Sequence, residues 1–374
     1  MPNNFRVYAT CDLGEALLGL RKRGYEVEVY PRPEAPPKSL IVEKVGSGID
    51  GLITTLRDQI DAEVFQAGQG TLKVVAQYAV GFDNISRGDA NRYQIPFTNT
   101  PDVLTETTAE FAFFMLGELA RKMWTAERLL RENQWSYWHP YLPLLGDEIT
   151  GKTIAIIGLG RIGQAMIKKC AGFDMNILCV TPTTRHSDYL KAIQEMMDLR
   201  YARQISKEKN WVKMVGFEEA LAQSDFLSLH VPLLRAGESS TPTYHLINER
   251  VLRRMKPTAF LVNTSRGPVV DEIALAKALK ENWIAGAALD VYEKEPLAAD
   301  SPLRDPSIED RCRLYPHFAS AGRITRLSPD PNLGMAGRCV QGLIDVLEGN
   351  YGGDLTQMPY VVNQEAFGRQ PGPA

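Results

Sequence analysis

The chain has 374 residues, and its 42 lysines and arginines nearly balance its 45 aspartates and glutamates, which leaves a formal net charge of −3 at pH 7. This balance provides no basic surface for nucleic acid or for an anionic membrane. No apolar run reaches the roughly 20 residues of a membrane span, and the first residues do not form a secretory signal.

The length predicts two domains and a sizeable buried core. The five cysteines are scattered, odd in number and free of any C-x-x-C spacing: Cys11, Cys170, Cys179, Cys312 and Cys339. This usage predicts reduced thiols in a cytoplasmic protein. The five histidines show no metal-ligand spacing with the cysteines, so we expect no metal site.

The N-terminal part of the chain alternates strand and helix patterns. We expect a helix over Gly14–Arg23 and strands over Arg6–Thr10, Tyr25–Tyr30, Gly51–Thr55 and Lys73–Ala76. The rhythm predicts a small α/β domain without a glycine-rich phosphate turn. The segment 79–84 follows the last of these strands, where open α/β sheets bind ligands. A ligand loop and a plain turn at Gly81 and Asn84 explain it equally well.

A further strand over Ile95–Asn99 precedes a long, mostly apolar helix over Thr107–Lys122, for which Thr105 is placed as a cap. Its composition predicts burial between domains or between subunits. An aromatic loop follows, with Trp135, Tyr137, Trp138 and Tyr141. We interpret this loop as a dimer contact rather than as the wall of a site or as plain hydrophobic cover.

The most informative stretch is GKTIAIIGLGRIGQA, which begins at Gly151. An apolar strand over Ile154–Ile157 leads into Gly158-Leu159-Gly160-Arg161-Ile162-Gly163, and a helix pattern continues to about Phe173. Strand, G-x-G-x-x-G and helix in this order predict a dinucleotide site. The first glycine permits the turn, the second admits the pyrophosphate, and the third lets helix and strand pack.

The end of the next strand, Ile177–Val180, bears on the choice of cofactor. An NAD site places an acidic residue there, about 20 residues past the glycines, to bind the ribose hydroxyls. This chain has no carboxylate at that position; it has Thr181, Pro182, Thr183, Thr184, Arg185 and His186. Three hydroxyls and a cation favour a 2′-phosphate, and hence NADP(H). The alternative is that Arg185 is only solvated and that NAD(H) binds.

The rest of this domain continues the strand–helix alternation. The long connection Ser187–Val215 predicts one extra surface helix. A helix over Phe217–Gln223 and a strand over Asp225–His230 follow, and His230, Val231 and Pro232 are placed to cover the adenosine. Later strands are expected over Ala259–Val262 and Gly286–Val291, with helices over Asn248–Met255 and Glu272–Glu281.

Arg266, Glu295 and His317 each follow a strand of this domain. Ends of parallel strands share one crevice, so these side chains can meet beside a nicotinamide. The set suits reduction of a 2-oxo acid: Arg266 to hold the carboxylate, His317 as general acid, and Glu295 to favour the imidazolium form. Each residue alone has a plainer explanation, as a surface cation, a solvated carboxylate and a core histidine.

These residues lie in motifs by which the chain resembles the D-isomer-specific 2-hydroxyacid dehydrogenases. The motifs span nearly the whole chain in the order of that family: VGFDNI from Val80, TNTPDVLTETTAEFAF from Thr98, GKTIAIIGLGRIGQ, NTSRGPVVDE from Asn263, ALDVYEKEP from Ala288 and PHFASAG from Pro316. NTSRGPVVDE with LDVYEKEP is far more specific than the glycines.

The resemblance implies that Arg266, Glu295 and His317 are the catalytic residues. It also implies that the backbone amides of Val80 and Gly81 bind the substrate carboxylate, and we place Leu56 in the substrate pocket. For the nicotinamide end of the cofactor it implies Thr105, Thr264, Ser265 and Asp290.

The resemblance further implies an α/β fold of two Rossmann-like or flavodoxin-like domains with parallel sheets. Residues 1–101 with 323–374 would form the substrate domain, and 102–322 would form the dinucleotide-binding domain inserted in it. A homodimer through the nucleotide domain is implied as well.

The sequence therefore predicts a D-specific, NADP(H)-preferring reductase of a small 2-oxo acid such as glyoxylate or hydroxypyruvate. Alternatives are a 2-ketogluconate-type sugar-acid reductase, which a pocket enlarged around Leu56 and Tyr78 would favour, and a phosphite- or formate-type dehydrogenase. A non-catalytic, NAD(H)-sensing corepressor is disfavoured because Arg266, Glu295 and His317 are all present.

Overall fold

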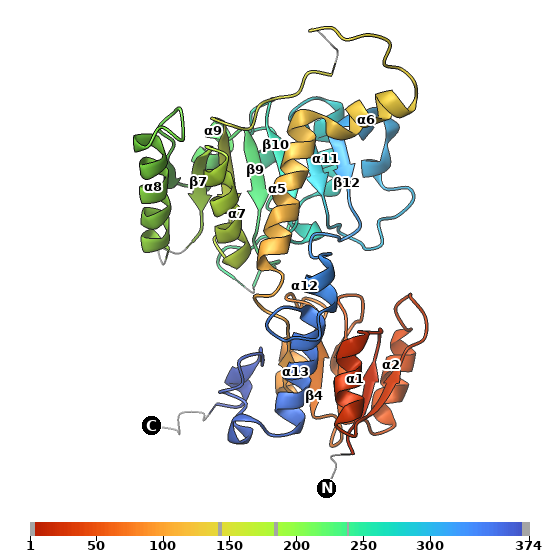
Figure 1. The fold of residues 1–374 in the computed structure, drawn as a ribbon. Helices are drawn as coiled ribbons and strands as arrows, with labels where there is room; N and C mark the ends of the chain where they lie inside the picture. The colour runs from red at the N-terminus through yellow and green to blue at the C-terminus, as the bar shows by residue number, and fades with distance from the viewer. Residues whose placement is uncertain (1–3, 141–143, 183–185, 238, 369–374) are drawn as a thin grey trace. The chain divides into compact units, whose positions relative to one another are not determined.

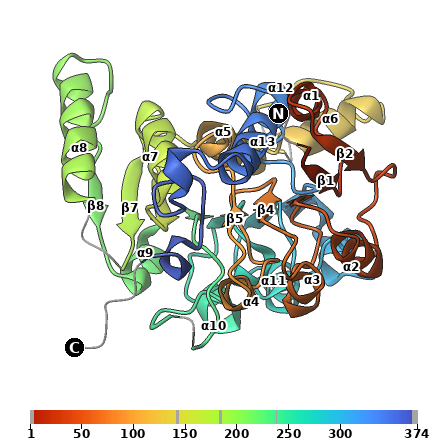
Figure 2. The same ribbon diagram turned by 90° about the horizontal axis from the view of Figure 1, so that it is seen from below.

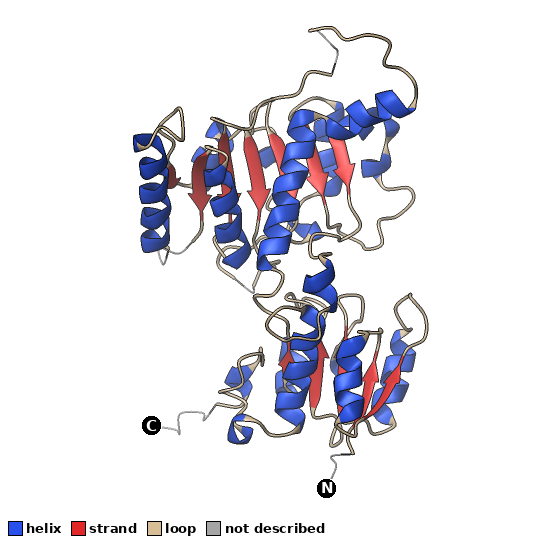
Figure 3. Ribbon diagram, in the orientation of Figure 1, coloured by secondary structure: helices blue, strands red, loops and turns tan. Residues whose placement is uncertain are grey.

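The computed structural model describes residues 4–140, 144–182, 186–237 and 239–368, and these form two compact units (Figure 1). One unit is Met1–Leu104 with Ala321–Ala374, and the other is Thr105–Ser320. Each unit has a sheet of parallel strands between layers of helices (Figure 3). The predicted α/β class with two parallel sheets is confirmed.

The sheet of the first unit has five strands in the order β2-β1-β3-β4-β5. Their bounds are β1 Arg6–Ala9, β2 Glu26–Val29, β3 Gly51–Thr54, β4 Val74–Gln77 and β5 Phe97–Thr98. The central strands β3 and β4 are buried at every residue, as expected for parallel strands covered on both faces. The carboxyl ends of β3 and β4 lie side by side because these strands pair directly.

The described part of this unit has six α-helices. They are α1 Glu15–Lys22, α2 Lys38–Gly46, α3 Ala62–Ala67, α4 Arg87–Arg92, α12 Arg323–Leu327 and α13 Met335–Leu347. Apolar residues of α1 and α13 form one core with the sheet, and those of α2, α3 and α4 form a second core on the opposite face. The C-terminal helix α13 therefore completes a unit that the N-terminal hundred residues begin.

The sheet of the second unit has seven strands in the order β12-β11-β10-β9-β6-β7-β8. Their bounds are β6 Thr153–Ile157, β7 Asn176–Val180, β8 Val212–Met214, β9 Phe226–Leu229, β10 Phe260–Asn263, β11 Gly286–Leu289 and β12 Cys312–Leu314. The chain order reverses between β6 and β9, and a crevice at such a switch point is where open α/β sheets bind ligands.

Helices cover both faces of this sheet too: α5 Thr105–Arg121, α6 Met123–Arg131, α7 Arg161–Gly172, α8 Ser187–Ala202, α9 Phe217–Gln223, α10 Glu249–Leu252 and α11 Glu272–Lys280. Helices α5, α7 and α8 share one core, and α9, α10 and α11 share the other. Glu106 of α5 pairs with Lys168 and Lys169 of α7, which adds a polar link along the packed helices.

Two local expectations need adjustment. The predicted extra helix is present as α8, but the same connection also contains β8, which pairs with β7 and extends the sheet at its edge (Figures 1 and 2). Its three residues are too few to show an alternation of buried and exposed side chains. Helix α5 begins at Thr105, so Thr105 is its first residue rather than the cap before it.

Among the described residues, no helix is long and apolar enough to cross a membrane.

Candidate active site

The turn between β6 and α7 has the geometry that its glycines predict. Gly158 has φ of +100°, and a Cβ there would lie 2.6 Å from the carbonyl oxygen of His230. At Gly163 a Cβ would lie 2.1 Å from the carbonyl oxygen of Gly158, so only glycine lets α7 begin this close to the strand. A Cβ at Gly160 would meet nothing within 4 Å.

These observations fit a bound dinucleotide. Gly160 precedes the first residue of α7 and, as the N-cap, has no side chain that could bond to the amides of the first turn. The helix N-terminus thus presents N–H groups and open space, which suits a pyrophosphate that comes within contact of the backbone. Arg161 and Ile162 are the first two residues of the helix.

At the end of β7, Thr181 is half-buried and no carboxylate follows the strand directly. The three other residues expected to read the ribose, Thr183, Thr184 and Arg185, lie outside the described residues. His230, Val231 and Pro232 follow β9, the neighbour of β6. Burial lowers the pKa of His230 to about 4, so the ring is neutral near pH 7, and its Nε2 lies 2.9 Å from the hydroxyl of Ser228.

Arg266 lies on a turn after β10 that Asn263 organises. The Asn263 amide oxygen accepts from the Ser265 N–H at 3.0 Å and from its hydroxyl at 2.7 Å, and the amide nitrogen donates to the Arg266 carbonyl at 3.0 Å. A Cβ on Gly267 would lie 1.8 Å from the carbonyl carbon of Tyr292. Glycine is therefore required for the Arg266 turn to pack against the segment that carries Glu295.

His317 and Glu295 form a direct pair. Nδ1 of His317 lies 2.7 Å from Oε2 of Glu295, and the other carboxylate oxygen accepts from the Tyr292 N–H at 3.1 Å. Burial would raise the pKa of Glu295, but the bond with His317, the Tyr292 N–H and the charge of Arg266 together hold it below its usual range. The carboxylate is therefore ionised at neutral pH, so Nδ1 carries the proton and any proton given to a substrate leaves from Nε2.

Asp290 holds the segment that contains His317. Its carboxylate is fully buried and accepts from the N–H groups of Phe318 at 2.6 Å and Ala319 at 2.8 Å. Its carbonyl accepts from the His317 N–H at 2.8 Å. These contacts stabilise His317 at φ of +53°, a left-handed backbone that a non-glycine residue seldom adopts. Burial raises the pKa of Asp290 although the two N–H groups oppose that effect.

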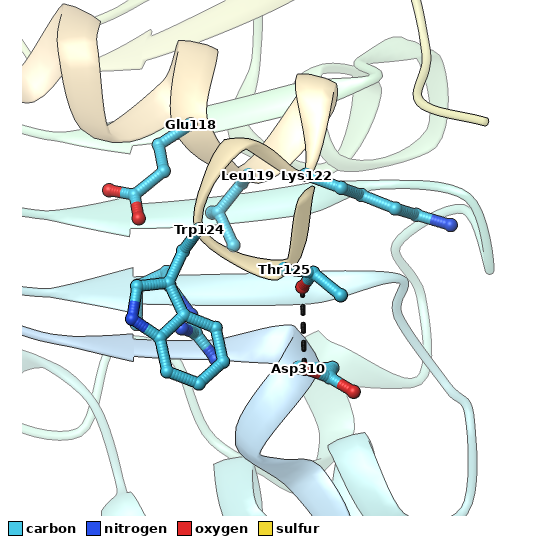
Figure 4. Close-up of a pocket in the computed structure, with 7 residues that line it drawn as sticks. Glu118, Leu119, Lys122, Trp124, Thr125 and Asp310 are labelled. Atoms are coloured by element: carbon cyan, nitrogen blue, oxygen red, sulfur yellow. Dashed lines mark hydrogen bonds between the residues drawn. The ribbon is translucent and has the colours of Figure 1, made fainter. Parts of the chain in front are cut away.

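The edge strand β12, which leads to His317, is anchored from both sides. The Tyr292 hydroxyl donates to the Tyr315 carbonyl at 2.8 Å, and the Tyr315 hydroxyl donates to Glu118 of α5. Figure 4 shows the neighbouring end of α5 and α6, where the Thr125 hydroxyl donates to Asp310 at 3.3 Å. Helices α5 and α6 therefore bond to the residues on either side of β12, the strand that leads to His317.

The second unit thus brings Arg266, Glu295 and His317 to the carboxyl ends of β10, β11 and β12. Thr264 and Ser265 lie on the same turn as Arg266, and the buried hydroxyl of Thr264 has no partner among the described residues. A buried hydroxyl of this kind is suited to form a hydrogen bond with a bound ligand. Thr105 is half-buried at the start of α5.

The first unit carries the remaining predicted residues. Leu56 follows β3, and Val80 and Gly81 follow β4. No hydrogen bond among the described residues uses the N–H of Val80 or of Gly81, and both residues are half-buried. Two adjacent backbone donors of this kind suit an anion.

Sequence reasoning did not find the residues that shape these turns. Asn263 and Gly267 lie inside the motif around Arg266, but their role follows only from close contacts across the fold. Of these residues, Gly267 could have been recognised from the sequence. A glycine directly after a candidate catalytic residue predicts that another backbone segment packs closely against it, here at Tyr292.

The fold and the site together define a nicotinamide-dependent oxidoreductase. The family model described as D-isomer specific 2-hydroxyacid dehydrogenase, NAD binding domain, matches residues 113–319. The chain belongs to the D-isomer-specific 2-hydroxyacid dehydrogenase family, and it is an NAD(P)-dependent oxidoreductase that acts on CH–OH donors and reduces 2-oxo acids.

Curated relatives resemble the chain over almost its whole length. A glyoxylate reductase of Korarchaeum cryptofilum is 43% identical over 98% of each chain, and one of Thermococcus litoralis is 38% identical over 98% of this chain and 99% of its own. Among solved structures, the TT0316 protein of Thermus thermophilus is 37% identical with a TM-score of 0.78, over 96% of this chain and 100% of its own.

Proposed function

We propose that the enzyme reduces a small 2-oxo acid, with glyoxylate or hydroxypyruvate as the substrate and NADPH as the preferred reductant. The observation that supports this most is the His317–Glu295 pair, 2.7 Å apart, beside the Arg266 turn and the open glycine cradle at one sheet edge. Relatives that bear the name glyoxylate reductase support the substrate class.

In the proposed reaction the bound cofactor supplies a hydride to the carbonyl carbon. Arg266 binds the substrate carboxylate and polarises the adjacent carbonyl through its guanidinium N–H groups. His317 gives a proton from Nε2 to the carbonyl oxygen as negative charge develops there. Glu295 keeps the ring oriented and stabilises the positive charge that the imidazole must carry before it donates.

The preference for NADPH is supported by the end of β7. Thr181 is found where an NAD site would have a carboxylate, and a carboxylate there would repel a 2′-phosphate.

We assign the binding of the cofactor to the unit Thr105–Ser320, and the binding of the substrate carboxylate to the unit that contains Val80 and Gly81.

We also propose a cytoplasmic homodimer. Phe114 of α5 is 69% exposed, Phe173 directly after α7 is 50% exposed, and Trp138 in the loop after α6 is 75% exposed. Exposed aromatic side chains of this number are typical of protein interfaces. Light scattering of the wild type should give twice the chain mass, and Phe114→Glu should shift the mass toward the monomer. The five unpaired cysteines suit a reducing compartment.

The experiment that tests the function is a panel of 2-oxo acids assayed with NADPH and with NADH. We expect kcat/KM to be highest for glyoxylate or hydroxypyruvate with NADPH. Activity confined to sugar acids would overturn the substrate, and equal or better activity with NADH would overturn the cofactor preference. Product of L configuration from a prochiral 2-oxo acid would contradict the stereochemistry.

A further inference from the structure

We propose that Asn99 and the Gln77–Asn84 pair are positioning residues for the loop whose Val80 and Gly81 N–H groups bind a substrate carboxylate: Asn99 fixes the direction of the Gly81 N–H, and the pair holds the Gly81 carbonyl that follows it. This inference rests on the proposed function, in which those two groups bind the carboxylate. None of the three amide side chains needs to touch the substrate.

Three consecutive peptide groups after β4 are each held through their carbonyl oxygen. The Ala79 carbonyl accepts from the Thr100 N–H at 2.9 Å. The Val80 carbonyl accepts from the Asn99 side-chain amide at 2.8 Å, and the Gly81 carbonyl accepts from the Gln77 side-chain amide at 3.3 Å.

These contacts determine where the neighbouring N–H groups point. A trans peptide is planar, with its C=O and N–H in opposite directions. The bond to the Ala79 carbonyl therefore orients the Val80 N–H, and the bond from Asn99 to the Val80 carbonyl orients the Gly81 N–H. Because both donors are oriented in advance, binding an anion there does not require the loop to be ordered first.

Asn84 connects this loop to the turn that carries Leu56. Its amide nitrogen donates to the Thr55 carbonyl at 3.0 Å and to the Asp58 carbonyl at 2.7 Å. Its amide oxygen accepts from the Gln77 amide nitrogen at 2.7 Å. The two carbonyl acceptors require the NH₂ group on their side, so the oxygen must face Gln77.

Gln77 is the centre of this network and is fully buried. Its amide oxygen accepts from the Thr54 hydroxyl at 2.7 Å, while its nitrogen serves Asn84 and Gly81. The ends of β3 and β4 are thus linked by side chains whose donors and acceptors are all matched. A change of one amide into a carboxylate places an acceptor opposite an acceptor without altering shape.

The test uses the isosteric changes Asn99→Asp and Gln77→Glu in the full-length enzyme. For each we expect KM for glyoxylate with saturating NADPH to rise about tenfold or more, and inhibition by oxamate to weaken by a similar factor. Turnover at saturating glyoxylate should stay within about threefold, because the groups that transfer the proton lie in the other unit. The Kd for NADPH should not change.

The matched control is Gln94→Glu, the same amide-to-acid change at an exposed side chain of the same unit, where the amide donates to the nearby Asn91 carbonyl at 2.7 Å. It should leave every constant unchanged. If Asn99→Asp does not fold, Asn99→Ala removes the donor without adding charge and carries the same expectation for KM.

A second substrate separates positioning from general damage. The methyl ester of glyoxylate lacks the carboxylate, so kcat/KM for the ester should be equal in the wild type and in Asn99→Asp. Equal losses for acid and ester, or an unchanged KM for glyoxylate in both isosteric variants, would overturn the inference. A wild type that reduces no 2-oxo acid would instead reject the proposed function, so the two failures are distinguishable.

Discussion

At the scale of single residues, His317 is the side chain whose chemistry is hardest to replace. Asparagine tolerates the left-handed backbone that His317 adopts at φ of +53°, so His317→Asn should fold without new strain. It cannot supply a proton from Nε2, and loss of a general acid typically costs about 10² to 10⁴ in rate. We expect turnover to fall by that range in steady-state assays.

Binding of NADPH to His317→Asn, followed by fluorescence titration, should match the wild type and serves as the control. Turnover within tenfold of the wild type would show that another group delivers the proton.

We expect Glu295 to set the pH range of the proposed reaction. Its pKa is held below the usual value by His317 and Arg266, so the carboxylate is ionised at neutral pH. Reduction needs a protonated imidazole, which the ionised carboxylate stabilises. In Glu295→Gln that charge is absent, so the alkaline limb of kcat/KM for reduction should move to lower pH. A pH–rate profile measured in parallel with the wild type checks this, and an unmoved limb would contradict the pairing.

His230 makes a testable contribution to stability in acid. Burial lowers its folded-state pKa to about 4, against about 6.5 in the unfolded chain. Between these two values the unfolded chain binds one more proton than the folded chain, so this residue makes the free energy of unfolding fall as the pH falls. His230→Gln removes the titration and should flatten the slope between pH 4 and pH 6.5 by up to about 1.4 kcal/mol per pH unit.

Urea unfolding at several pH values measures that slope. Above pH 7 the His230→Gln change should have no pH-dependent effect, since both states of the wild-type histidine are then neutral. Identical slopes for variant and wild type would show that the ring is solvated in the folded protein.

At the scale of elements, two glycines of the turn between β6 and α7 are expected to have different roles: Gly163 in packing the helix on the strand, and Gly160 in contact with the cofactor. A methyl group at Gly163 would collide with the Gly158 carbonyl, whereas one at Gly160 meets no protein atom within 4 Å. We expect Gly163→Ala to lower the stability of the fold by about 1–3 kcal/mol. Gly160→Ala should leave the melting temperature nearly unchanged and weaken NADPH binding at least tenfold, because the methyl group occupies space that the pyrophosphate needs.

Gly172→Ala is the control for this pair, since a Cβ there also meets nothing within 4 Å and lies at the far end of α7. It should affect neither stability nor binding adversely. If Gly160→Ala binds NADPH as tightly as the wild type, the pyrophosphate does not approach the turn at that residue.

The elements also show what the sequence could and could not reveal. Strands such as β6 and β9 are mostly apolar, and the short apolar run locates each of them to within a residue or two. The three-residue β8 has only one buried side chain and becomes a strand because β7 offers it a partner. Tertiary pairing of this kind leaves no local signal.

The candidate site shows the same division. Motifs were sufficient to nominate His317 and Glu295, because their residue types and positions after strands are visible in the chain. The buried network of Gln77, Asn84 and Asn99 cannot be predicted from the sequence, because these amides form hydrogen bonds with groups up to 29 residues away in the chain. Amide side chains in a sequence give no indication of which backbone groups they will meet.

At the scale of the whole molecule, the groups that we propose for catalysis are divided between two units. The unit Thr105–Ser320 is continuous in sequence, has its own two-sided core and carries the glycine turn with Arg266, Glu295 and His317. The unit completed by α13 carries the Val80 and Gly81 donors. The division predicts that cofactor binding and turnover can be separated by cutting the chain.

A fragment of residues 105–320 should therefore fold and bind NADPH with a Kd within about tenfold of that of the full enzyme, because the pyrophosphate cradle and the turns after β9, β10 and β11 all lie within it. The fragment should not reduce glyoxylate measurably, since it lacks the backbone donors that we assign to the substrate carboxylate, and one anchored end does not hold a small substrate in a reactive orientation. Circular dichroism and NADPH fluorescence test the first expectation, and a coupled absorbance assay tests the second. The same fragment with Gly160→Ala is the control, and it should fold but bind NADPH at least tenfold more weakly. A folded fragment that turns over glyoxylate at the rate of the full enzyme would show that Arg266 alone suffices to bind the substrate.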